Sequence, residues 1–340
     1  MNEETLVAWL RRRTAGDGGV RRGSRIGDDT AALPRRPGRT IVTVDQQIEG
    51  IHFQEGLDPA IVARRLLAVN LSDLAASGAE PRHAFLALAA PEQFDHRRFF
   101  NALLTACRRH RISLSGGDLA TSVFPHFSLT LLGEKRASDA TLGRDRARPG
   151  HRVWIGGTLG ESALGCWLLA LGAAPDGRFA DPSASLPAGA TAARRIAHAV
   201  KRHLRPAPQL ELGRWLAALG PRRAGAAIDV SDGFAKDLHR ICDASGVGAE
   251  IDAAALRSAT APGFASLCEA FNLDPAGLVE SGGEDYVLLF TLPPAVAPPP
   301  RFRARAIGVV TRRREVVVVD RGGDAAALAP RGWDHLQPAE

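Results

Sequence analysis

The sequence predicts an α/β or α+β protein with two domains. Its 340 residues are enough for two sizeable cores. In the first half, short apolar runs alternate with segments of helical periodicity, which is typical of packed strand and helix layers. A second series of this kind begins after the turn-forming triplet Arg148-Pro149-Gly150. We therefore expect an N-terminal α/β domain over residues 1–148 and a C-terminal α/β domain over residues 149–340.

The first half predicts the following elements in order. Helical periodicity predicts helices over residues 4–13, 59–76 and 94–110, and apolar runs predict strands over 40–44, 85–90 and 127–134. A Gly-rich loop is expected from the first helix to Arg25. The first strand should end at Asp45, and the run 112–114 should lead into the turn Gly116-Gly117-Asp118. Both acids would then stand where a strand ends.

The second half predicts strands over residues 153–155, 226–230 and 287–292 and helices over 162–171, 191–204 and 234–244. A loop is expected over 173–188, and the runs 306–310 and 315–319 are expected to pair as a terminal hairpin. Gly156 and Gly160 follow a strand but lack dinucleotide-loop spacing, and the chain has no Gly-Lys-Ser/Thr motif. We expect these two glycines to allow close strand-to-helix packing.

Composition excludes several classes of function. The net charge is +6, and Lys135, Lys201 and Lys236 are the only lysines among 43 basic residues. The arginines are scattered without interleaved aromatic residues, which favours a role in solubility over nucleic-acid binding. The sequence opens without a signal-peptide pattern and has no long apolar stretch, so we expect a cytoplasmic protein that does not enter a membrane. The four cysteines match no metal-ligand spacing, and the helical patterns predict that Cys107, Cys166 and Cys242 are buried.

Seven aspartates lie in short motifs rich in glycine and small residues. The motifs are Gly27-Asp28-Asp29, Thr43-Val44-Asp45, Leu71-Ser72-Asp73-Leu74, Gly116-Gly117-Asp118 and Ile228-Asp229-Val230-Ser231-Asp232-Gly233. Carboxylates that converge repel one another unless a cation or a substrate phosphate lies between them, and Mg²⁺ is usually held by a few carboxylates together with phosphates. The glycines leave room for the backbone to approach a polyphosphate. This pattern predicts a site for magnesium and a nucleotide.

Each of these residues also has an ordinary structural interpretation. Asp28, Asp73 and Asp232 could cap helices, because aspartate accepts the unpaired N–H groups of a first turn. His52 could be a structural histidine, and Trp333 could pack on the core.

Taken in order, the motifs resemble those of the thiamine-monophosphate kinase family, within the superfamily of aminoimidazole ribonucleotide synthetase. The further motifs that carry the resemblance are Glu49-Gly50-Ile51-His52-Phe53, Gly143-Arg144, Lys201-Arg202-His203-Leu204-Arg205-Pro206, Ser281-Gly282-Gly283-Glu284-Asp285-Tyr286 and Gly332-Trp333-Asp334-His335. The resemblance covers essentially the whole chain. It implies the two-domain architecture of that superfamily, with the N-terminal sheet domain pairing with a second copy in a homodimer.

The resemblance also implies roles for individual residues. The implied magnesium ligands are Asp29, Thr43, Val44, Asp45, Asp73, Asp118, Asp229 and Asp232. The implied ATP contacts are Gly117, Asp118, Arg144 and Ser231. The implied contacts to thiamine monophosphate are His52, Glu284 and Trp333. An aromatic face and a carboxylate suit a cationic thiazolium, and a guanidinium suits a phosphate. Among these residues, Asp45 and Asp118 are expected to be indispensable for catalysis.

The expected reaction is ATP-dependent phosphorylation of thiamine monophosphate to thiamine diphosphate, by direct in-line transfer with several Mg²⁺ ions. The chain departs from the family pattern at Val44, Gln46, Gln47, His151 and Val287. Val44 could contact a metal only through its backbone carbonyl, and none of the departures removes a carboxylate. Two alternatives stay open: a related ATP-dependent enzyme with another phosphate or carbonyl-oxygen acceptor, and a degenerate nucleotide-binding protein.

Overall fold

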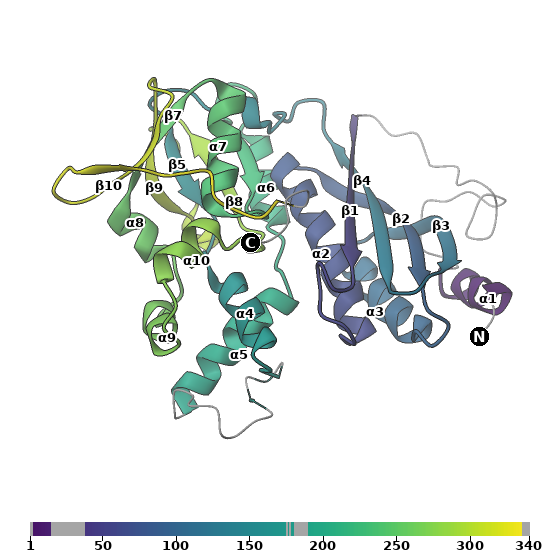
Figure 1. The fold of residues 1–340 in the computed structure, drawn as a ribbon. Coiled ribbons are helices and arrows are strands. Elements are labelled where there is room, and N and C mark those ends of the chain that lie inside the picture. Colours follow the sequence, from purple (N-terminus) through teal and green to yellow (C-terminus); the bar gives the residue numbers. More distant parts are fainter. Residues whose placement is uncertain (1–2, 15–37, 175, 177, 180–189, 335–340) are drawn as a thin grey trace. The chain divides into compact units, whose positions relative to one another are not determined.

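The computed structural model describes residues 3–14, 38–174, 176, 178–179 and 190–334 (Figure 1). The predicted Gly-rich loop, Asp28 and Asp29 lie outside these residues, as does most of the predicted loop 173–188. The chain divides into two compact units. Unit 1 comprises residues 1–74 and 79–138, and unit 2 comprises residues 75–78 and 139–340.

Unit 1 is built around one mixed sheet. Its elements are α1 (Glu3–Thr14), β1 (Arg39–Ile48), α2 (Pro59–Ser77), β2 (Glu80–Ala90), α3 (His96–Arg109), β3 (Ser113–Thr121) and β4 (His126–Lys135). The strand order is β1-β4-β2-β3, and β2 and β3 are parallel while the other neighbours are antiparallel. The helices and strands predicted for this half are confirmed, although several strands run further than their apolar runs.

One face of this sheet carries the core of unit 1. Phe127, Leu129 and Leu131 alternate along β4 and are fully buried, as the two-residue period of a half-covered strand requires. Phe99 of α3 stacks on Phe127 with ring centroids 4.6 Å apart. The amphipathic helix α3 thus covers the apolar face of the sheet, and Asp95 caps its first turn by accepting from the Arg98 N–H.

Unit 2 contains a larger mixed sheet and most of the helices. Its strands are β5 (Arg152–Ile155), β6 (Ala227–Asp229), β7 (Gly248–Asp252), β8 (Leu288–Leu292), β9 (Arg305–Thr311), β10 (Val316–Val319) and β11 (Ala325–Ala327). Its helices are α4 (Glu161–Ala170), α5 (Ala190–Leu204), α6 (Leu210–Ala218), α7 (Phe234–Ser245), α8 (Ala253–Ser258), α9 (Phe264–Ala270) and α10 (Pro275–Ser281), with short 3₁₀ turns η1 (Arg144–Arg146) and η2 (Pro300–Phe302). The strand order is β11-β10-β7-β9-β5-β8-β6.

The predicted terminal hairpin is wrong. The two apolar runs do form β9 and β10, but β7 lies between them, antiparallel to β9 and parallel to β10. The antiparallel partner of β10 is β11 instead. The connection between β9 and β10 is short, but β7 lies between the two strands. It forms the backbone hydrogen bonds that would join β9 to β10 in a hairpin.

The glycines after β5 allow close packing, as predicted. A Cβ on Gly156 would lie 2.8 Å from the Leu212 side chain of α6, and one on Gly160 would lie 2.8 Å from the ring of Phe264. Gly160 also has φ +81°, which a residue with a side chain rarely adopts. Leu212 belongs to a core cluster of unit 2 that includes Trp154 and Phe290.

Three of the four cysteines are buried, namely Cys107, Cys242 and Cys268. The prediction that Cys166 is buried is wrong, because the core side of α4 carries Leu164 and Leu168 and turns Cys166 outward. None of the described helices combines the length and apolar character that crossing a membrane requires.

Candidate active site

The two acids predicted at strand ends lie inside strands. Asp45 is opposite Leu129 within β1, and Asp118 is opposite Ala87 within β3. The expectation of strand exits is therefore wrong for both residues. In β1 the residues after the apolar run still alternate between the two faces of the sheet, and β3 continues because its pairing with β2 extends to Thr121.

One face of β1 forms a polar layer against α2. Thr43, Asp45 and Gln47 share this face, since they are two residues apart. The Thr43 hydroxyl donates to the Asp73 carboxylate, and the Nε of the fully buried Arg65 donates to Gln47 Oε1 at 3.1 Å. Asp73 lies inside α2, so it is not the N-cap of a helix. The predicted residues Thr43, Asp45 and Asp73 thus belong to one polar surface in unit 1.

Val44 points the other way. Its side chain is 56% exposed on the opposite face of β1, beside the similarly exposed Val42. An apolar side chain offers no ligand to a cation, so any metal contact of Val44 would have to come from its carbonyl oxygen.

Gly117 and Asp118 lie in β3 beside β2, and Gly117 has a backbone φ of +154°. A Cβ on Gly117 would lie 1.9 Å from the carbonyl oxygen of Leu86, so only glycine fits there. The neighbouring Asp118 is exposed. His52 follows β1 in a turn, where its Nδ1 accepts from the Ile48 N–H at 3.1 Å. This contact places the ring proton on Nε2.

In unit 2, three chain segments distant in sequence come together: residues 229–233, 281–286 and 332–334. The Glu284 N–H donates to the Ser231 carbonyl at 2.7 Å, and the Trp333 N–H donates to the Asp232 carbonyl at 2.8 Å. A Cβ on Gly283 would lie 2.7 Å from the Ser231 oxygen, so the glycines of these motifs permit backbone-to-backbone packing. The predicted residues Ser231, Asp232, Glu284 and Trp333 therefore lie in one assembly.

The turn that carries Ser231 and Asp232 is held by two residues that the sequence did not single out. The buried Asp237 accepts the N–H groups of Ser231 and Asp232 at 3.1 and 3.2 Å. Arg240 pairs with Asp237 at 2.6 Å and with Asp232 at 2.5 Å. Burial raises the pKa of Asp237 to about 6. Asp232 is an ion-pair partner and the N-cap position of α7 is Gly233, so the helix-cap interpretation of Asp232 is wrong.

Asp229 ends β6 with only 5% of its surface exposed. Arg144 is exposed in η1, and its carbonyl accepts from the Ser245 hydroxyl at 2.7 Å. This hydrogen bond holds the backbone of Arg144 against α7.

Glu284 belongs to a charged network that sequence reasoning missed. His203 Nδ1 lies 3.2 Å from the Glu284 carboxylate and 3.3 Å from the Ser162 hydroxyl. The adjacent Asp285 is buried and accepts the N–H groups of Gly160 at 2.7 Å and Ser162 at 3.2 Å. Burial raises the pKa of Asp285 to about 7. The segment that carries Glu284 is thereby anchored to the start of α4.

Trp333 is not a core residue, because its side chain is 42% exposed. Its backbone is held on both sides, by the N–H bond to Asp232 and by the Lys236 ammonium, which donates to the Trp333 carbonyl. The backbone of Trp333 is therefore anchored while part of its side chain is exposed.

The acidic residues are divided between the two units, with Asp45, Asp73 and Asp118 in unit 1 and Asp229 and Asp232 in unit 2. Among the residues that the structure describes, no three His, Cys, Asp or Glu side chains are gathered into a metal-binding group. The oxygen donors at these positions are of the type that Mg²⁺ prefers.

Two family models match the chain. The N-terminal domain model of AIR synthase related proteins matches residues 27–134, and the C-terminal domain model matches residues 148–321. The chain is 30% identical over 314 residues to a thiamine-monophosphate kinase of Aquifex aeolicus, covering 92% of each chain.

Solved structures give the same result. The crystal structure of a thiamine-monophosphate kinase from Stenotrophomonas maltophilia K279a is 32% identical, with a TM-score of 0.77 and coverage of 96% of this chain and 98% of that one. The structure of AaThiL complexed with AMPPCP and TMP is 28% identical, with a TM-score of 0.74 and coverage of 98% and 97%. The chain belongs to the thiamine-monophosphate kinase family of AIR synthase related proteins, and its predicted two-domain architecture is confirmed.

Proposed function

We propose that this member of the thiamine-monophosphate kinase family transfers the γ-phosphoryl group of ATP to thiamine monophosphate, giving thiamine diphosphate and ADP. The observation that carries the proposal is the similarity, over nearly the whole chain, to a structure that contains AMPPCP and TMP. A phosphate oxygen of the acceptor forms the new bond to the γ-phosphorus. The bond from that phosphorus to the β–γ bridging oxygen breaks, and its electron pair leaves with ADP.

The acceptor phosphate is already ionised, so the reaction needs positioning and charge neutralisation and no general base. In this proposal, Arg144, Ser231 and the backbone at Gly117 contact ATP. Trp333 covers the ring system of thiamine monophosphate, and Glu284 and His52 contact the same molecule. The anchored backbones of Glu284 and Trp333 support these roles, because a held backbone fixes where the side chain can reach.

The proposed magnesium ligands are Asp29, Thr43, Val44 through its carbonyl, Asp45, Asp73, Asp118, Asp229 and Asp232. Bound Mg²⁺ would neutralise the negative charge that accumulates on the transferring phosphates. Two observations support the fit to a hard cation: the donors are oxygens, and Asp118 is exposed within a strand, where a carboxylate contributes little to packing.

We also propose that the enzyme is a cytoplasmic homodimer that pairs through the sheet of unit 1. Val42 and Val44 support this pairing, since they leave an apolar stripe exposed on β1, an edge strand of that sheet.

The experiment that tests the function incubates purified protein with Mg-ATP and thiamine monophosphate and separates the products by chromatography. The expected products are thiamine diphosphate and ADP in equal amounts. Replacing thiamine monophosphate with thiamine should give no product, because the proposed acceptor is the phosphate. ADP formation without thiamine diphosphate would overturn the proposal and favour a related enzyme with another acceptor.

A further inference from the structure

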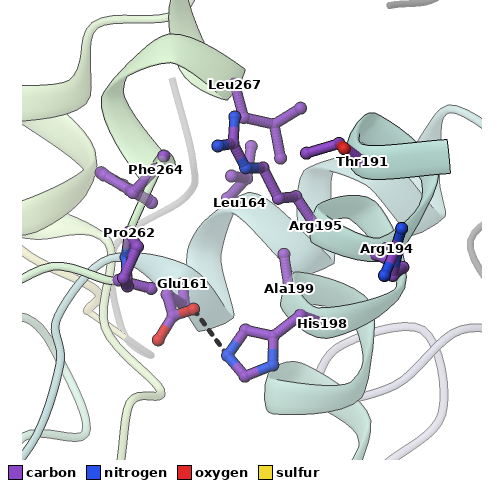
Figure 2. Close-up of a pocket in the computed structure, with 12 residues that line it drawn as sticks. Glu161, Leu164, Thr191, Arg194, Arg195, His198, Ala199, Pro262, Phe264 and Leu267 are labelled. Carbon is purple, nitrogen blue, oxygen red and sulfur yellow. Dashed lines mark ion pairs between the residues drawn. The ribbon is translucent and has the colours of Figure 1, made fainter. Parts of the chain in front are cut away.

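Unit 2 contains a further cavity. It is lined by none of the residues proposed to contact ATP, thiamine monophosphate or magnesium. It lies between α4, α5 and the segment that opens α9, and its volume is about 420 Å³ (Figure 2). Small-molecule sites in proteins usually have volumes of about 300–1,000 Å³ and mostly apolar walls with a few polar groups. The cavity has this size.

The body of the cavity is apolar. Leu164 of α4 and Phe264 and Leu267 of α9 line it with 4% or less of their surface exposed, and the exposed Pro262 adds a further apolar wall. Figure 2 shows Phe264 and Pro262 on one side of the space and α5, with Ala199, on the other. These walls suit a flat ring or a short hydrocarbon.

Among the described residues that line the cavity, the one acid, Glu161, has protein partners at both carboxylate oxygens. Glu161 is 3% exposed, the Thr158 hydroxyl donates to its Oε2, and His198 Nε2 lies 2.9 Å from its Oε1. The Glu161–His198 pair is the dashed contact in Figure 2. Arg202 Nε also lies 4.0 Å from Oε2, so an arginine of α5 supplies positive charge beside this acid.

Arg195 supplies a positive charge at the same cavity. Its guanidinium lies over Gly263, where a Cβ would be only 2.2 Å from Cζ, so the absence of a side chain at residue 263 makes room for it. Within the described part of the chain, its only hydrogen bond is a long one of 3.4 Å to the Ser266 hydroxyl. A guanidinium has five N–H donors in a fixed fork that matches carboxylate, sulfonate or phosphate oxygens.

We propose that this cavity binds a small organic anion with an apolar ring, whose anionic group contacts Arg195 and whose ring lies against Leu164, Phe264 and Leu267. None of the proposed ATP and thiamine monophosphate contacts lines the cavity, so the proposal does not depend on the identity of the reaction.

The test titrates the full-length protein with 1-anilinonaphthalene-8-sulfonate, an aromatic sulfonate that fluoresces in apolar surroundings. The same titration uses N-phenyl-1-naphthylamine, which has the rings without the sulfonate. The variants are Arg195→Glu and, as a matched control, Arg312→Glu, which changes an exposed arginine of the β9–β10 connection. Circular dichroism checks that both variants are folded.

We expect one saturable sulfonate site per chain, at least tenfold weaker binding to Arg195→Glu, and unchanged binding to Arg312→Glu. The neutral compound should bind at least tenfold more weakly than the sulfonate and should not respond to Arg195→Glu. Saturating Mg-ATP or thiamine monophosphate should not displace the sulfonate. Displacement by either substrate, binding that ignores Arg195→Glu, or the absence of a saturable site would each overturn the proposal.

Discussion

Asp45 and Asp118 are carboxylates inside β-strands, where aspartate is disfavoured. Their proposed role as metal ligands explains why such residues stand there. Asp45→Asn and Asp118→Asn should each lower kcat by at least about a hundredfold, because losing a charged ligand removes about 3 kcal/mol or more of transition-state stabilisation. Initial rates at saturating Mg²⁺ measure the effect. The melting temperature should change little.

Asp243→Asn is the matched control, since Asp243 is an exposed aspartate of α7 with no proposed role. It should keep near-native kcat. Near-native activity in either of the strand variants at saturating Mg²⁺ would remove that aspartate from the proposed metal ligands.

Trp333 is the residue whose surroundings favour substrate contact over packing, since its backbone is fixed and its indole is exposed. Trp333→Ala should raise the KM for thiamine monophosphate by about 5- to 30-fold, because losing a cation–π partner costs roughly 1–2 kcal/mol. The KM for ATP is the internal control and should stay within about twofold. Equal weakening of both substrates, or a large fall in melting temperature, would instead make Trp333 a structural residue.

At the scale of elements, the start of α4 is held by the carboxylate of Asp285, which comes from a segment distant in the sequence. Asp285 accepts the N–H groups of Gly160 and Ser162, and burial raises its pKa to about 7 from the ordinary value of 3.8. Between these two pH values the folded chain binds a proton at Asp285 that the unfolded chain does not bind. The stability contributed by this group is therefore fully present below about pH 4 and falls as the pH rises to about 7.

Asp285→Asn cannot ionise, so it escapes this loss. The free energy of unfolding of the variant relative to the native protein should rise by up to about 1.4 kcal/mol per pH unit between about pH 4 and 7. Denaturant unfolding at several pH values measures this slope. Asp58→Asn is the control: a hydrogen bond from Arg98 lowers the pKa of Asp58 to about 2, so its stability difference should be flat over this window. A flat difference for Asp285→Asn would contradict the assignment.

The elements also show what the sequence could and could not predict. Long periodic segments such as α2, α3 and α5 were predicted, because the helical period is a local property of the chain. The short elements α6, β7, α8, α9 and α10 were not predicted. The pairing of β10 was predicted wrongly, because it depends on β7, more than sixty residues away in the sequence.

The candidate site shows the same contrast between features that are local in the sequence and contacts between distant segments. The motifs identified the residues that meet in unit 2, since glycines and acids at turns are visible locally. The supporting residues Asp237, Arg240, His203 and Asp285 were missed as partners, because no local pattern shows their contacts. Arg240 and His203 pair with side chains, Asp237 accepts backbone N–H groups of the preceding turn, and only Asp285 accepts from backbone far away in the sequence. An Asp at the fourth position of a helix that follows a Ser-Asp-Gly turn is a signal that could have pointed to Asp237.

At the scale of the whole molecule, the proposed ligands come from both units, and neither unit carries the full set. No cysteine lies in the glycine and aspartate motifs, and the candidate aspartates are assigned to metal. A covalent route needs a nucleophile beside an activating base. We therefore expect direct transfer, in which both substrates bind before any product leaves.

The fate of the γ-phosphate tests this account most directly. The protein is incubated with γ-³²P-labelled ATP and Mg²⁺, with and without thiamine monophosphate, and the label is followed in the separated products and in the protein. With the acceptor present, the account predicts one label in thiamine diphosphate for each ADP formed, and without it no label on the protein. ADP formed without labelled thiamine diphosphate, or label retained on the protein in the absence of acceptor, would contradict it.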